Sequence, residues 1–255
     1  MKILPRSFFL PFVTFCGVTL VWFLASAFGG WSSQVFPGPL RVVASIWELT
    51  LNGSMIKHTI ASLFRVTAGF YLAILFAVPL GMLFGRSQNL MDAFNPIIQF
   101  MRPISPLAWI PLAMLWFGIG DMPAVFLIFL SSFFPLVVST TLAVKSIKPT
   151  YFQVAANFGL TTWEIVNRII VPAMLPSVLT ALRITLGIAW LVVVAAEMIA
   201  VDSGLGYLIL DSRNALRMDY VMAGMVVIGL TGLGLDMVMK WLGKSDSVSW
   251  ANLSR

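Results

Sequence analysis

Residues 178–200 read VLTALRITLGIAWLVVVAAEMIA and hold only two charged side chains, Arg183 and Glu197. A helix needs about 20 mostly apolar residues to cross the hydrocarbon core of a bilayer. This run is long enough and apolar enough to do so, and it therefore predicts a membrane-spanning helix.

Five further runs meet the same criterion. The six predicted spans are Phe8–Phe28, Ile60–Phe84, Pro96–Phe117, Pro123–Val144, Val178–Ala200 and Tyr220–Leu242. The chain of 255 residues is 59% hydrophobic and only 10% charged, whereas soluble domains carry about 25% charged residues. These features predict an all-α integral membrane protein with little mass outside the bilayer.

The first run could also be read as a signal peptide, because Lys2 and Arg6 precede it and Ala25-Ser26-Ala27 resembles a cleavage site. Its apolar part is about twice as long as the 7–15 residues of a typical signal peptide. An uncleaved first span is therefore favoured, and cleavage stays open.

A short amphipathic helix is expected after the first span, behind the turn formed by residues 36–39. Apolar residues recur at helical spacing on one face and polar residues take the other: Leu40, Val43, Trp47 and Leu51 against Arg41, Ser45 and Glu48. The helix could lie on the membrane surface or form a lid over the bundle.

The whole chain, residues 1–255, is expected to form one transmembrane domain. Within it, residues 1–58 hold the first span and the amphipathic helix, residues 59–243 form the core, and residues 244–255 form a tail. With the N-terminus in the cytoplasm, nine Lys and Arg residues lie inside and five outside. This excess predicts that both termini are cytoplasmic.

Polar residues in the spans are candidates for a transport pathway or gate. Arg102 lies in a run interrupted by several prolines, and broken helices can line a cavity where a fixed guanidinium would suit an anion. Ser105, Pro106 and Trp109 share that run. The alternative for Arg102 is snorkelling to the membrane interface.

Two carboxylates lie inside predicted spans. Glu197 would repel an anionic substrate, so we expect it to pair with Arg65 or Arg213 as an outer gate. Asp236 is four residues before Lys240, a spacing that favours an ion pair on one helix face. Either carboxylate could instead serve as a proton relay in a proton-coupled secondary transporter.

Chemistry within the chain is not indicated. The sequence has one cysteine, Cys16, and one histidine, His58, and it lacks a Gly-rich phosphate loop with lysine. We expect no catalytic, metal or cofactor site, and a membrane-embedded enzyme is a weak alternative. ATP, if it drives transport, must bind a separate subunit.

The most informative loop is residues 145–177. Pro149 suits the first turn of a helix, Gly159 suits its end, and Thr161 with Glu164 forms a capping box for a second helix. This second helix is expected to reach Ile170 and to be broken by the following prolines, Pro172 and Pro176. From these residues alone, a partner-docking hairpin and a hairpin packed on its own bundle are equally favoured.

This loop resembles the "EAA" signature of ABC-importer permeases. The matching residues are Gln153-Val154-Ala155-Ala156-Asn157-Phe158-Gly159, followed by Ile169-Ile170-Val171-Pro172 and Leu175-Pro176. In that family the segment docks on the ATPase subunit, so the resemblance assigns coupling to Gln153, Ala155, Ala156, Gly159, Leu160 and Glu164. Gln153 stands where the family usually has Glu, which leaves a charge contact with the ATPase in doubt.

Further segments resemble the nitrate, sulfonate, taurine and bicarbonate branch of these permeases. They are Arg102–Leu112, Trp116–Gly120, Ala195–Ala200 and Gly204–Tyr207. The resemblance implies a type I ABC-importer permease fold in the bacterial inner membrane, paired with a second permease copy as a homodimer. It also implies ATPase subunits that bind ATP and Mg, an extracytoplasmic solute-binding protein, and a small oxyanion or sulfonate as substrate. Residues 117–120 favour a sulfonate or taurine over nitrate or bicarbonate.

Overall fold

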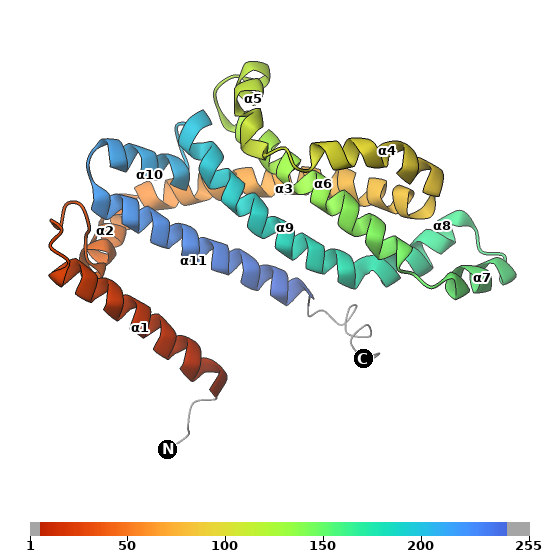
Figure 1. The fold of residues 1–255 in the computed structure, drawn as a ribbon, viewed down its shortest axis with the longest axis horizontal. Helices are drawn as coiled ribbons and strands as arrows, with labels where there is room; N and C mark the ends of the chain where they lie inside the picture. Colours follow the sequence, from red (N-terminus) through yellow and green to blue (C-terminus); the bar gives the residue numbers. More distant parts are fainter. Residues whose placement is uncertain (1–5, 244–255) are drawn as a thin grey trace.

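A computed structural model describes residues 6–243, and these residues form helices and no strand (Figure 1). The helices are α1 (Arg6–Phe28), α2 (Pro39–Leu51), α3 (Ser54–Arg86), α4 (Gln88–Met101), η1 (Pro106–Trp109), α5 (Ile110–Phe117), α6 (Asp121–Lys145), α7 (Pro149–Asn157), α8 (Thr162–Ile165), the π turn η2 (Val166–Ile170), α9 (Val171–Ala200), α10 (Leu205–Asn214) and α11 (Met218–Gly243). The all-α prediction is confirmed for these residues. The predicted tail, 244–255, lies outside them.

Helices α3, α6 and α9 form the centre of the bundle, and glycines on α3 let α6 approach closely. A Cβ on Gly81 would lie 2.6 Å from the Cβ of Thr140, and one on Gly85 would lie 2.5 Å from the Cβ of Val144. The small-xxx-small spacing of these two glycines is typical of such contacts. Larger residues at either position would push the two helices apart.

Among residues 6–243, five helical segments are long and apolar enough to cross a membrane. The third predicted span, Pro96–Phe117, is wrong as a continuous helix, because α4 ends at Met101 and only the short helices η1 and α5 follow. Pro106 accounts for the change of direction, since a proline disfavours helical geometry at the residue before it, and Ser105 has a ψ of 130°. The chain still runs from one end of the bundle to the other here. Gln88 pairs with Lys145 at the α7–α8 end, and Asp121 pairs with Arg65 at the α2–α10 end.

The predicted break at Pro172 and Pro176 is also wrong. Residues Thr162–Ala200 run as one helical segment through α8, η2 and α9. The π turn η2 ends at Ile170, two residues before Pro172, and a widened turn can absorb irregular backbone hydrogen bonding without ending a helix. The hairpin of α7 and α8 is therefore joined to α9 without a loop.

Helix α2 forms as predicted. It packs on the bundle with one face, as a lid would, and leaves another face uncovered, as a helix on the membrane surface would. One face is buried against the bundle through Val42, Ser45 and Leu49. The apolar face predicted from helical spacing is uncovered, with Leu40, Val43, Trp47 and Leu51 between 64% and 77% exposed. An uncovered apolar face beside a membrane bundle is suited to lipid.

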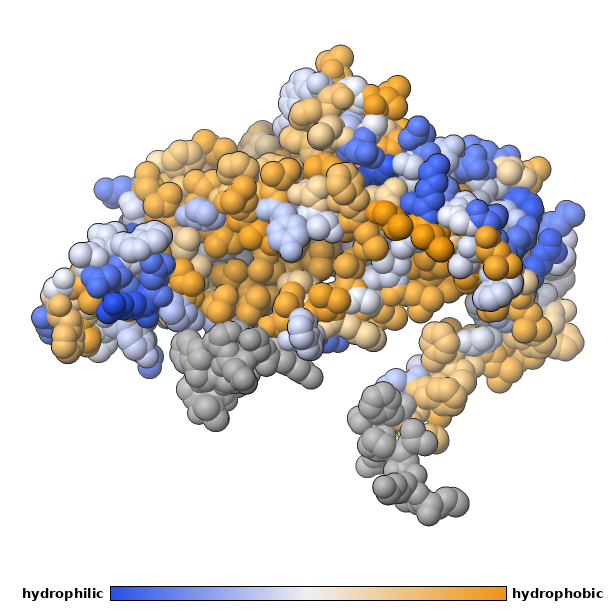
Figure 2. Space-filling view, turned by 180° about the vertical axis from the view of Figure 1, so that it is seen from behind, coloured by the Kyte–Doolittle hydropathy of each residue, from blue (hydrophilic) through white to orange (hydrophobic). Residues whose placement is uncertain are grey.

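Hydrophobic side chains cover the middle of the molecule, and hydrophilic ones gather toward its two ends (Figure 2). This banding is what a bilayer requires of a spanning protein, with an apolar belt between two polar regions. The hairpin of α7 and α8 lies at one end, and α2 and α10 lie at the other (Figure 1).

Candidate functional site

The α7–α8 hairpin turns at Gly159, which has a φ of +64°. The backbone N–H of Gly159 donates to the carbonyl of Ala156, and that of Leu160 donates to the carbonyl of Ala155, both at 3.0 Å. This pair of bonds is a Schellman motif, and its left-handed residue is usually glycine because a Cβ is disfavoured there. The predicted helix end at Gly159 is confirmed.

The predicted capping box at the start of α8 is also confirmed. Thr161 Oγ1 accepts from the backbone N–H of Glu164, and Glu164 Oε2 accepts from the N–H of Thr161 at 2.9 Å. Arg168 adds an ion pair one turn later, at 3.6 Å from Glu164. The turn between the two helices is therefore defined on both sides by local bonds.

Large apolar side chains of the hairpin are uncovered. Phe158 is 79% exposed and Trp163 is 73% exposed, while Tyr151 and Val154 are also exposed. Exposed aromatic residues gathered on one projection typically mark a protein interaction surface. This favours a docking hairpin over one packed on its own bundle.

The predicted coupling residues all lie on this hairpin, but they differ in how far their side chains are exposed to solvent. Ala155 is buried, Leu160 and Glu164 are half-buried, and Gln153, Ala156 and Gly159 are exposed. Ala155 thus anchors α7, while the exposed members remain available to a partner. Their role in coupling stays a prediction.

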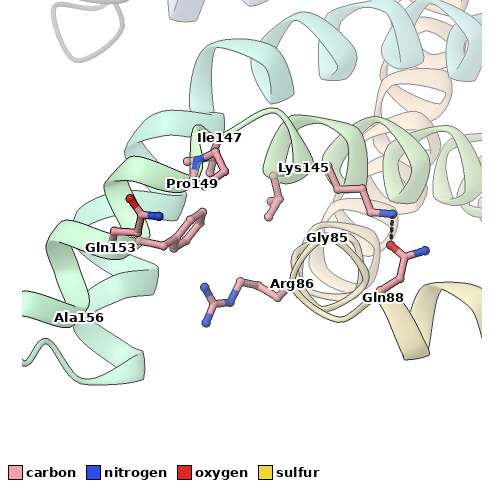
Figure 3. A pocket seen from close by; sticks show the side chains of 10 residues that line it. Gly85, Arg86, Gln88, Lys145, Ile147, Pro149, Gln153 and Ala156 are labelled. Atoms are coloured by element: carbon pink, nitrogen blue, oxygen red, sulfur yellow. Dashed lines mark hydrogen bonds between the residues drawn. The ribbon is translucent and has the colours of Figure 1, made fainter.

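A groove of about 710 Å³ separates α7 from the ends of α3 and α6 (Figure 3). Gln153 lines it, with Arg86 and Lys145 as its charged residues. The Arg86 guanidinium lies 5.1 Å from the ring centre of Phe152, and Lys145 Nζ donates to Gln88 at 3.0 Å. With two cations and no carboxylate in its lining, the groove suits an acidic side chain.

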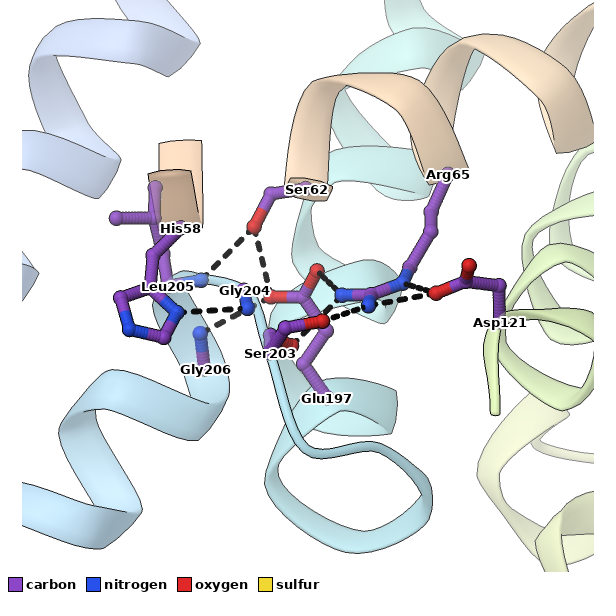
Figure 4. Close-up of polar contacts among 9 residues, drawn as sticks. All are labelled: His58, Ser62, Arg65, Asp121, Glu197, Ser203, Gly204, Leu205 and Gly206. Atoms are coloured by element: carbon purple, nitrogen blue, oxygen red, sulfur yellow. Dashed lines mark hydrogen bonds and ion pairs between the residues drawn. The ribbon is translucent and has the colours of Figure 1, made fainter. Parts of the chain in front are cut away.

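The opposite end of the bundle holds a buried ion-pair cluster (Figure 4). Arg65 and Glu197 are 1% and 0% exposed, and Arg65 Nη1 lies 2.7 Å from Glu197 Oε1. Arg65 also pairs with Asp121 at 2.6 Å and donates to the carbonyl of Ser203 at 2.7 Å. The predicted pairing of Glu197 is therefore with Arg65, from α3, and a gating role for it stays a prediction.

The same cluster fixes the loop between α9 and α10. The N–H groups of Gly204, Leu205 and Gly206 donate to His58, Ser62 and Glu197, respectively, at 2.9–3.0 Å. Gly204 has a φ of +105°, and a Cβ there would clash with the Glu197 carboxylate. A charged core thus holds four helices (α3, α6, α9 and α10) and the loop between α9 and α10 in a single arrangement (Figure 4).

The other pathway candidates do not join this cluster. Arg102 caps the C-terminal end of α4, and Ser105, Pro106 and Trp109 lie at and just after the break that follows. Within residues 6–243, no hydrogen bond or ion pair of the Arg102 side chain is recorded. Its role in a pathway stays a prediction.

Sequence reasoning missed three partners in these charged contacts. Asp121 and Ser203 contact Arg65, and Arg183 pairs with Asp236. Asp236 also makes its predicted ion pair with Lys240, at 2.8 Å. A partner for Arg183 could have been expected from the sequence, since a charge within an apolar span requires one.

Residues 77–245 match the family model described as "Binding-protein-dependent transport system inner membrane component". The taurine transport system permease protein TauC of Escherichia coli is 32% identical over 244 residues, covering 94% of this chain and 89% of TauC. The nitrate import permease protein NrtB of Synechococcus elongatus is 33% identical over 250 residues, covering 92% and 89%. These matches confirm the resemblance stated from the motifs.

The fold is similar to that of the MetNI methionine ABC transporter in an inward-facing conformation. The TM-score is 0.60 at 16% identity, over 75% of this chain and 97% of that one. The predicted type I permease fold is thus confirmed, although one of its six spans is broken. The chain belongs to the family of inner membrane components of binding-protein-dependent transport systems, as an ABC-importer permease.

Proposed function

We propose that this permease is the pore-forming subunit of an ATP-driven importer for a small oxyanion or sulfonate, and that it works by alternating access. The α7–α8 hairpin is the observation that carries the proposal. It projects at one end of the bundle, with exposed aromatic residues beside a basic groove. Such a surface fits a partner protein, and we assign that partner as the ATPase.

The hairpin is also placed to transmit movement. Residues Thr162–Ala200 form one helical segment of 39 residues, about 58 Å at 1.5 Å per residue. This segment ends beside Glu197 and the buried cluster. Closure of an ATPase pair against the hairpin would therefore move the helix that reaches the proposed outer gate.

The proposal extends to the partners and the membrane orientation. The hairpin faces the cytoplasm, where ATP is available, and both chain ends lie on that side. A second copy, forming a homodimer, completes the pathway, and a solute-binding protein delivers substrate at the α2–α10 end. ATP and Mg bind the ATPase, and this chain holds no cofactor. Lipid covers the apolar belt.

The substrate class rests on the relatives, which are named for taurine and nitrate import. Both substrates carry a small group with several negatively polarised oxygens. The residues at 117–120 favour the sulfonate side of this class. The proton-coupled alternative is less favoured, because Glu197 is 0% exposed and both of its oxygens are already hydrogen-bonded.

Gly159→Trp tests the coupling role in the complex reconstituted with its ATPase. A side chain at this left-handed position costs about 1–2 kcal/mol of local stability, and the indole adds bulk where the partner docks. We expect ATP hydrolysis to continue while uptake of taurine or nitrate falls sharply. Measuring both rates in proteoliposomes separates coupling from insertion.

Gly53→Trp is the matched control. Gly53 has a φ of +76°, and, as at Gly159, a Cβ there would have no neighbour within 4 Å. It starts α3 at the opposite end of the bundle, so this variant should keep its coupling. Normal coupling in Gly159→Trp, or transport that needs no ATPase, would overturn the proposal.

A further inference from the structure

A second group of charges lies between α9 and α11, away from the hairpin and the buried cluster. Asp236 accepts from Arg183 Nη2 at 3.2 Å and pairs with Lys240 Nζ at 2.8 Å. Two cations face one carboxylate, so the group carries a net charge of +1. The three side chains are between 34% and 51% exposed, unlike the sealed pair of Arg65 and Glu197.

Arg183 and Asp236 lie within α9 and α11, away from the helix ends, whereas Lys240 lies in the last turn of α11. Arg183 is twelve residues after the start of α9 at Val171, which is about 18 Å along the helix. Asp236 is seven residues before the end of α11 at Gly243, or about 10 Å. A charge that faces lipid along a spanning helix is costly, and charged residues in such helices face a water-filled cavity or another protein surface.

A cavity of about 410 Å³ opens beside the charges, lined by α9 and α11. Gly187 lies one turn after Arg183 and also lines it, and a Cβ on Gly187 would have no atom within 4 Å. Since one water takes about 30 Å³, the cavity has room for a small oxyanion with part of its hydration shell. The space lies where the guanidinium can reach it.

We propose that Arg183 forms an oxyanion-binding site at this cavity on the translocation pathway, with Asp236 as its positioning residue and Lys240 as a second cation that pairs with Asp236. Asp236 accepts from the Nε and Nη2 of Arg183. A guanidinium has five N–H donors, so the Nη1 side remains for the oxygens of a nitrate or sulfonate group. This site deepens the proposed function and rests on it, since it names where the transported anion binds.

The carboxylate also limits how tightly the anion is held. Passage through a pathway requires binding that is strong enough for entry and weak enough for release. Two unopposed cations at low local dielectric would retain an anion, whereas Asp236 reduces their field. If the group were only structural, its contribution would come from the ion pair between Arg183 and Asp236. An anion-binding role and a structural role therefore predict different effects when one or both of these charges are removed.

Charge substitutions separate these roles in the reconstituted complex with its ATPase and binding protein. Nitrate, taurine and ethanesulfonate serve as probes. We expect Arg183→Gln to lower ATP-dependent uptake at limiting substrate by about 10- to 100-fold, the range for losing a charge-assisted hydrogen bond. Asp236→Asn should lower the half-saturating concentration, because the cations are freed. The double variant should stay as impaired as Arg183→Gln.

Substitutions within the cavity test the site without changing charge. Gly187→Leu fills the space beside the guanidinium and should reduce uptake as strongly as Arg183→Gln. Gly229→Leu on α11 is the matched control, because a Cβ there also has no neighbour within 4 Å, yet the residue does not line the cavity. It should import normally.

Two results would overturn the site. One is a double variant restored to wild-type uptake while each single variant is impaired, since this is the signature of a structural ion pair. The other is normal import by Gly187→Leu. If the proposed function were wrong, the wild-type complex itself would import none of the three probes with ATP. The proposed site would then be wrong as well.

Discussion

At the scale of single residues, the buried charges show what spacing along a chain can predict. Glu197 needed a cationic partner, and the sequence offered Arg65 or Arg213. The structure selects Arg65, with 1% exposure, whereas Arg213 lies on α10 and is exposed. Spacing along one helix does not determine which helices become neighbours. Asp236 and Lys240 were predictable as partners because they share a helix.

Glu197→Ala should destabilise the protein by about 1–3 kcal/mol, because it leaves the Ser62 hydroxyl and the Gly206 N–H without their buried acceptor, while Arg65 keeps its ion pair with Asp121. The loop at Gly204 and Gly206 packs on the same carboxylate and should loosen with it. Thermal unfolding of the detergent-purified protein measures the effect.

Glu48→Ala is the control for this loss of a carboxylate. Glu48 is 60% exposed and lies 3.9 Å from Arg217, so its removal should cost at most about 1 kcal/mol. Equal losses of stability in the two variants would show that the buried cluster does not hold the bundle together.

At the scale of helices, capping residues predicted the helix ends correctly, whereas prolines did not. Gly159 and the Thr161–Glu164 pair act through bonds within a few residues, so the sequence predicted the hairpin turn correctly. The effect of a proline depends on the turn around it. Pro172 follows a π turn and continues the helix, whereas the backbone leaves helical geometry at Ser105, the residue before Pro106.

Thr161→Ala removes the side-chain cap of α8 and should cost about 1 kcal/mol of local helix stability. Because α8 continues into α9, the loss should appear as faster backbone hydrogen exchange at residues 162–166, with little effect on the spans. Thr162→Ala is the neighbouring control, since no side-chain hydrogen bond of Thr162 is recorded in the described chain. Equal exchange in the two variants would contradict a capping role.

At the scale of the whole molecule, the predicted path of the chain through the bundle is unchanged, although the predicted span Pro96–Phe117 is not one helix. The segment from Gln88 to Asp121 still connects the two ends of the bundle, though as α4, η1 and α5 instead of one span. Hydropathy detects apolar length, and it does not detect whether that length is one helix. With this path, the orientation predicted from the Lys and Arg bias places the hairpin and the start of α11 on opposite sides of the membrane, and this orientation stays a prediction.

Labelling of single cysteines tests this orientation directly. Cys16 is the one cysteine of the chain, so Cys16→Ala gives a background without thiols. Phe158→Cys and Leu216→Cys then place one thiol at each end, at positions 79% and 78% exposed. A membrane-impermeant maleimide should label position 216 in right-side-out vesicles and position 158 only in inverted ones. The reverse pattern would place the hairpin outside, where no ATPase could reach it, and both the orientation and the coupling role would then be wrong.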